Sequence, residues 1–139
     1  MQNNHGELLA AGAGKINYAA SALHTEAMAA YKGLLFASQW GMPRIILETN
    51  TSVLASTLNV NGIDRSGVGG LIQQVQQIMR FEFSSCVISN CSRCCNKVAD
   101  ALATYGVCML SFDAELLIRQ SPDFVSELVA GDLPKCCVQ

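Results

Sequence analysis

The stretch RIILETN, residues 44–50, sets three adjacent aliphatic side chains before a polar end. A short apolar run of this kind predicts a strand over residues 44–49, of the type covered on both faces. The residues that follow, SVLASTL at 52–58, predict a short helix that begins almost at once. In α/β proteins, binding sites form where a strand ends and a helix begins. Asn50 is therefore the first candidate site residue.

Outward from this strand, helices and strands alternate. Upstream, a glycine-weakened strand at 7–16 precedes a helix that Ser21 caps and that ends near residue 40. Downstream, we expect a helix at 68–80, a strand at 83–89 and a helix from a cap at Asn96 to about residue 109. This order predicts an α/β sheet with crossover helices. We expect one domain at 1–112 and a C-terminal tail at 113–139 that carries a short helix.

The composition limits what this chain can bind. Of 139 residues, 50% are hydrophobic and only 14% are charged, and the formal net charge is −2. Nine basic residues are scattered along the chain without forming a run. Proteins dedicated to nucleic acid usually carry a basic surplus, because neutralised phosphates supply much of the affinity. Any binding to nucleic acid is therefore expected to be weak and sensitive to salt.

Seven cysteines, an odd number without an apolar leader, indicate a reducing, intracellular setting, with nucleus and cytoplasm not distinguished. No apolar run is long enough to span a membrane, so no membrane partner is expected. Cys91-x-x-Cys94, with Cys95 beside it, matches one half of a zinc knuckle. The other half would have to come from the adjacent pair at 136–137, which chelates poorly. Ordinary loop thiols are the preferred reading, and a zinc protein is the alternative.

Three polar motifs occur in an order and at a spacing that are similar to those of a known protein family. They are SALHTEA at 21–27, which contains Glu26; the strand end at Asn50; and NKVADALA at 96–103, which contains Asp100. Together they resemble the ribonuclease H-like superfamily, most closely the plant reverse-transcriptase-associated, type-1 domain. The resemblance covers about residues 4–110.

This resemblance implies a mixed sheet with flanking helices. It also implies an enzyme that cuts the RNA strand of RNA–DNA hybrids with two metal ions held by four carboxylates. The segment GELLAAG at 6–12 is similar to the third strand of the family fold. We therefore expect an N-terminally truncated domain that lacks the first two strands and the first catalytic aspartate.

Residue by residue, the resemblance gives Glu26 and Asp100 the places of two catalytic carboxylates, here as vestigial metal ligands. Asn50 takes the place of a further aspartate, Asn90 that of a histidine, and Asn96 matches a family asparagine. Mg²⁺, the family cofactor, prefers anionic oxygens in octahedral order, and an amide offers only a neutral one. We therefore expect poor Mg²⁺ binding and little or no hydrolysis. The substitution Asn50→Asp alone is not expected to restore activity.

Each of these residues also has a structural explanation. Glu26 suits a solvated helix, Asp100 favours the helix dipole, Asn96 suits an N-cap, and Asn50 suits a turn. The expected function is weak binding of RNA–DNA hybrid or other nucleic acid by a retrotransposon-derived pseudoenzyme. The alternative is a non-catalytic interaction module or retroelement fragment that self-associates through an exposed sheet edge.

Overall fold

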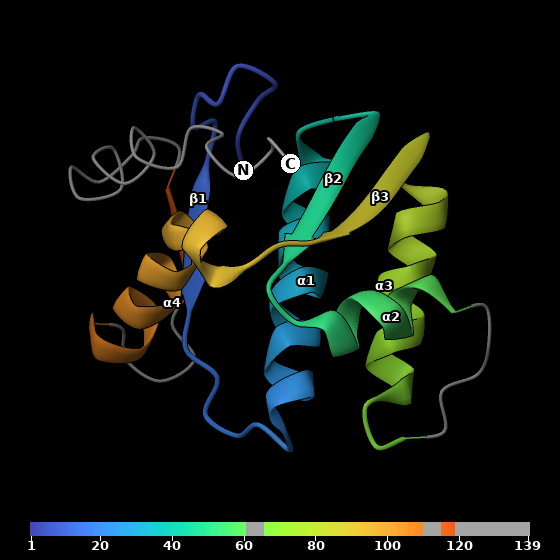
Figure 1. Ribbon diagram of the computed structural model, residues 1–139, viewed down its shortest axis with the longest axis vertical. Helices are drawn as coiled ribbons and strands as arrows, with labels where there is room; N and C mark the ends of the chain where they lie inside the picture. Colours follow the sequence, from blue (N-terminus) through green and yellow to red (C-terminus); the bar gives the residue numbers. More distant parts are fainter. Residues whose placement is uncertain (61–65, 110–114, 119–139) are drawn as a thin grey trace. The chain divides into compact units, whose positions relative to one another are not determined.

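The computed structural model describes residues 1–60, 66–109 and 115–118 (Figure 1). Along the chain its elements are β1 (Ala11–Gly14), α1 (Ala22–Gln39), β2 (Arg44–Thr49), α2 (Ser52–Asn59), α3 (Gly69–Phe81), β3 (Ser85–Asn90), the 3-10 turn η1 (Arg93–Cys95), α4 (Lys97–Met109) and β4 (Glu115–Ile118). This order confirms the α/β fold class, which is compatible with a ribonuclease H-like fold. The chain forms two compact units, one of Tyr18–Cys91 and the other of Met1–Asn17 with the chain from Ser92 onward.

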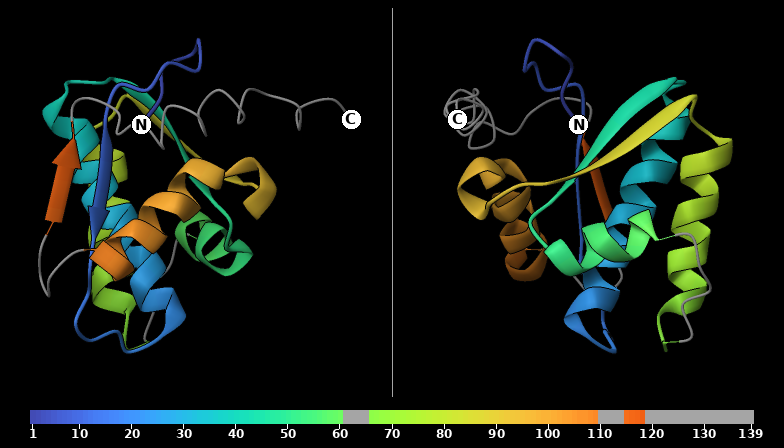
Figure 2. Two further views of the ribbon diagram at one scale, coloured as in Figure 1. Left: turned by 90° about the vertical axis from the view of Figure 1, so that its left-hand side faces the viewer. Right: turned by 45° about the vertical axis from the view of Figure 1, so that its right-hand side comes forward.

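The Tyr18–Cys91 unit is built on a parallel pair of strands, β2 and β3. Ile46 is opposite Val87 in this pair, and Thr49 is opposite Asn90. Parallel strands need a crossover connection, and α2 and α3 supply it. Both α1 and α3 lie on the same side of the pair (Figures 1 and 2). The strand predicted at 44–49 is confirmed.

One expectation about this strand was wrong. The run at 44–49 was predicted to be covered on both faces, but Ile46 is 68% exposed and Val87 is 54% exposed. The neighbouring side chains Ile45, Leu47, Cys86 and Ile88 are half-buried, so burial alternates along both strands. Within the part of the chain that the structure describes, helices cover one face of the pair and leave the other open.

The core of this unit is made by helix faces. Helix α1 buries Ala27, Ala30, Leu34 and Ala37, at spacings of three and four residues, as an amphipathic helix should. It packs against α3, which buries Ile72 and Val75. Small alanines on α1 allow this close approach.

Gln76 is a buried polar residue within the same core. Its side-chain Nε2 donates to the carbonyls of Val60, Leu58 and Thr57, at 3.0, 3.4 and 3.5 Å. The last carbonyls of a helix have no partner within the helix. Gln76, on α3, therefore supplies donors at the carboxyl end of α2.

The second unit pairs β1 with β4 in antiparallel register and packs α4 against β1. Its core centres on Ala11 and Leu102. The strand predicted at 7–16 is shorter than expected, and β4 was not expected at all. The helix predicted in the tail lies outside the described residues.

Helix α4 approaches β1 closely at two glycines. A Cβ placed on Gly106 would stand 2.7 Å from the carbonyl oxygen of Gly14, well inside normal contact. Glycine at 106 therefore permits the packing of α4 on β1.

Candidate metal and nucleic-acid site

The carboxyl end of the β2–β3 pair brings Asn50 and Asn90 to the same edge. Asn90 is opposite Thr49, and Asn50 is the next residue after Thr49. The ladder extends one step further, because the amide of Cys91 donates to the carbonyl of Thr49 at 2.9 Å. Both predicted amide positions therefore lie at the strand ends, where α/β proteins place their sites.

Asn50 is held in a local turn. Its Oδ1 accepts from the hydroxyl of Thr51 at 3.3 Å, and the Thr51 amide donates to the hydroxyl of buried Thr49 at 3.2 Å. The only side-chain oxygen that Asn50 could offer a metal ion thus already accepts a hydrogen bond. These contacts turn the chain from β2 into α2.

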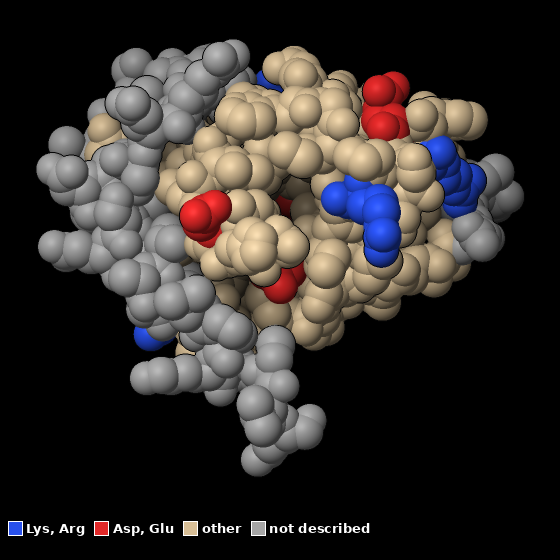
Figure 3. Space-filling view, turned by 90° about the horizontal axis from the view of Figure 1, so that it is seen from above, with Lys and Arg blue, Asp and Glu red and all other residues tan. Residues whose placement is uncertain are grey.

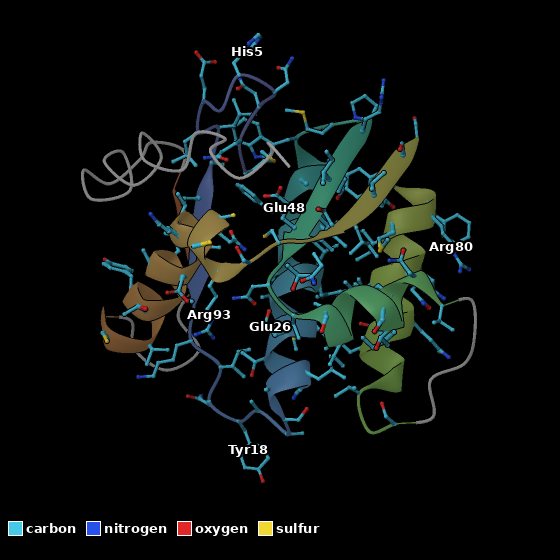
Figure 4. The ribbon with its side chains drawn as sticks, viewed as in Figure 1. His5, Tyr18, Glu26, Glu48, Arg80 and Arg93 are labelled. Atoms are coloured by element: carbon cyan, nitrogen blue, oxygen red, sulfur yellow. The ribbon has the colours of Figure 1, made fainter. Side chains whose placement is uncertain are left out.

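Glu26 lies half-buried in the early part of α1, on the Tyr18–Cys91 unit (Figure 4). The start of this helix is fixed by a reciprocal cap. Ser21 Oγ accepts from the amide of His24 at 3.1 Å, and His24 Nδ1 accepts from the amide of Ala20 at 3.1 Å. Helix α1 also contacts α2, which begins at the carboxyl end of β2. The helix of Glu26 therefore borders the same end of the unit.

The capping role of His24 was not predicted, although the sequence indicates it. Ser21 and His24 have the spacing of a capping box, in which the third residue after the cap bonds back to the chain. Histidine replaces the usual Glu or Gln here and supplies an imidazole nitrogen as the acceptor.

Asp100 belongs to the other unit, in the first turn of α4. Its amide donates to the carbonyl of Asn96 at 3.1 Å, the first bond of the helix, and its side chain is exposed. Arg93 and Lys97, just before and at the start of α4, are also exposed. A cationic pair and a helix N-terminus therefore occur together in this short stretch.

The described residues contain few side chains that could hold a metal ion together. No three His, Cys, Asp or Glu side chains gather there in a way that could hold a metal ion. The carboxyl end of the β2–β3 pair contributes the side-chain amides of Asn50 and Asn90. Glu26 and Asp100 are the two matched carboxylates, and they belong to different units. Their role as metal ligands stays a prediction.

The loop before α4 holds a thiol cluster. The hydroxyl of Ser92 lies 2.8 Å from Cys94 Sγ and 3.3 Å from Cys95 Sγ, and the two sulfurs are 3.8 Å apart. The sequence motif Cys91-x-x-Cys94 lies in this loop, where the sulfurs of the adjacent residues Cys94 and Cys95 are in contact. Neither Cys94 nor Cys95 forms a disulfide.

No helix in the described ranges is long and apolar enough to cross a membrane. Neither the curated proteins nor the solved structures contain a match to this chain. The model of one protein family, described as reverse transcriptase-like, matches residues 1–106. Such domains are of the ribonuclease H-like type, in agreement with the α/β order of the elements. The chain belongs to the reverse transcriptase-like family.

Proposed function

We propose that this chain is a ribonuclease H-like domain that binds RNA–DNA hybrid weakly and does not cleave it. The observation that carries the proposal is the pair of amides, Asn50 and Asn90, at the carboxyl end of the β2–β3 pair. Family membership supports binding to nucleic acid, and the amides argue against hydrolysis.

Electrostatics disfavours hydrolysis at this edge of the sheet. Two-metal hydrolysis holds two dications about 3.5–4 Å apart, and anionic ligands offset their repulsion. Asn50 contributes a neutral oxygen, which also accepts a hydrogen bond from Thr51 and cannot offset the charge of a dication as a carboxylate does. Loss of a metal-held transition state removes several kcal/mol of stabilisation, or on the order of 10³-fold in rate. The donors at this edge do not fit two Mg²⁺ ions, so we derive no catalytic step.

Arg93 and Lys97, which are exposed around the first turn of α4, support binding to nucleic acid. Phosphates bind at helix N-termini because backbone amides and the helix dipole both favour an anion there. Elsewhere cations are sparse. On the face in Figure 3, most of the blue surface gathers on one side with a red side chain near it, and most of the other described surface is uncharged. Affinity should therefore be low and should fall steeply with salt.

Fluorescence anisotropy with a labelled RNA–DNA hybrid tests the binding surface. The double variant Arg93→Ala, Lys97→Ala should bind several-fold more weakly and should lower the slope of log affinity against log salt by about one per lost phosphate contact. Arg44→Ala removes an exposed cation from β2 and serves as the matched control. Equal losses in both variants would contradict the assignment of the surface to α4.

The origin of the chain and its cellular setting are part of the same proposal. Similarity to the plant type-1 domain supports an origin in a plant retrotransposon. None of the described cysteines forms a disulfide, which supports a reducing, intracellular setting.

A second candidate function, an interaction module, has its own observation. Ile46 and Val87 are opposite each other on the open face of the β2–β3 pair, and both are more than half exposed. Exposed apolar pairs on a sheet favour association. If a second copy of the chain covers this face, Ile46→Lys should shift a dimer to monomer in light scattering. Val107→Lys, at an exposed apolar residue of α4, is the control. A monomeric unsubstituted chain would remove this candidate.

A further inference from the structure

The thiol cluster at η1 is independent of the proposed nucleic-acid function. It consists of Cys94 and Cys95 with Ser92, all in the turn before α4 (Figure 4 labels Arg93 of the same turn). Cys94 is exposed and Cys95 is half-buried, so the sulfurs can be reached from solvent.

The distance between the two sulfurs is close to that expected when both bind the same metal ion. Cys94 Sγ and Cys95 Sγ are 3.8 Å apart. Two thiolates on one tetrahedral zinc ion, each about 2.3 Å from the metal, are also about 3.8 Å apart. A soft atom could therefore bind both sulfurs without moving them.

A disulfide between the same two sulfurs fits the spacing of the backbone less well. Neighbouring Cα atoms are about 3.8 Å apart across a trans peptide, whereas disulfides usually join Cα atoms roughly 4.4–6.8 Å apart. Bridging by a third atom avoids this mismatch.

Ser92 completes the cluster. Its hydroxyl is within hydrogen-bond distance of both sulfurs, at 2.8 and 3.3 Å. A hydroxyl that donates to a thiolate stabilises the form of sulfur that binds metals. The Ser92 hydroxyl carries one proton, so it can donate to one of the two sulfurs at a time.

We propose that Cys94 and Cys95 form a dithiol site for a soft, thiophilic metal or metalloid ion. Binding is a substitution at the ion and involves no redox step. With a trivalent arsenical oxide, both thiols give up their protons to the oxide oxygen, two As–S bonds form, and one water leaves. With a divalent ion, two thiolates replace two bound waters and two protons enter solution.

The test uses the full chain carrying Cys136→Ser and Cys137→Ser, because that pair is also adjacent in sequence. The reduced protein is mixed with phenylarsine oxide, washed with excess monothiol and weighed by intact mass spectrometry. One retained arsenical per chain is expected. Cys94→Ser and Cys95→Ser should each lower retention at least tenfold. Cys108→Ser, which removes another exposed thiol, should leave it unchanged.

A second arm uses Cd²⁺, followed by its sulfur-to-metal absorption in the ultraviolet. Absorption that depends on both cysteines assigns the site to divalent soft ions as well. Arsenical capture without this absorption restricts it to trivalent metalloids. Retention that persists in Cys94→Ser, or absence of both signals in the chain with Cys94 and Cys95 intact, overturns the proposal.

Discussion

At the scale of single residues, the buried side chain of Gln76 and the half-buried thiol of Cys86 both affect the free energy of unfolding. Gln76 shows how one polar side chain can satisfy a helix end from a neighbouring helix. Cys86 shows how burial alters a titratable group on a strand. Neither role follows from the residue type alone, since glutamine and cysteine are common both at surfaces and in cores.

The substitution Gln76→Leu should lower the free energy of unfolding by about 1–3 kcal/mol, because buried carbonyls at the end of α2 lose their donor. Urea unfolding followed by circular dichroism measures the change. Gln74→Leu, on an exposed position of the same helix, should change stability far less. Equal effects in the two variants would show that the hydrogen bonds to α2 contribute nothing.

Burial raises the pKa of the Cys86 thiol above its ordinary value of 9.0. The unfolded chain therefore releases this proton first as pH rises, and the native state loses stability from about pH 9 upward through the folded pKa. The loss between pH 8 and 10.5 should be smaller in Cys86→Ala than in the unsubstituted chain, as measured by urea midpoints. A steeper loss in Cys86→Ala than in the unsubstituted chain would contradict the direction of the shift.

At the scale of elements, close packing sets where glycine is required. Gly106 faces the Gly14 carbonyl across the α4–β1 contact, whereas a Cβ on Gly33 of α1 meets nothing within 4 Å. The two helical glycines therefore differ in the space that is available for a Cβ atom.

The substitution Gly106→Ala should destabilise the chain by about 1–3 kcal/mol through overpacking. Gly33→Ala should stabilise it by up to about 1 kcal/mol, because alanine has the higher helix propensity. Thermal unfolding of the two variants measures both signs. A stabilised Gly106→Ala variant would mean that α4 does not approach β1 this closely.

Element prediction succeeded where the local signal was strong. Ser21 at the cap located the start of α1, and the aliphatic run at 45–47 located β2. It failed where a strand or its burial depends on pairing or packing with residues that are distant in the sequence. β4 exists through its pairing with β1, about a hundred residues away, and the open face of β2 depends on which elements cover it.

At the scale of the whole molecule, the motif spacing predicted the family that the comparison then showed. The strand that Asn50 follows was predicted and is confirmed, whereas the register that brings Asn90 to the same end of the strand pair was not predicted. The hydrogen bond from Thr51 to Asn50 was not predictable, because it depends on side-chain rotamers in the turn. The contact between Cys94 and Cys95 likewise depends on the 3-10 geometry of η1.

The central claim is a ribonuclease H-like domain without hydrolysis. The most direct measurement is cleavage of a labelled RNA–DNA hybrid by the purified chain in Mg²⁺ and in Mn²⁺, beside Glu26→Gln and Asp100→Asn. The account predicts no cleavage above background in either metal, with hybrid binding still detectable at low salt. Cleavage that both substitutions abolish would contradict it, because Glu26 and Asp100 would then support catalysis despite the amide at Asn50.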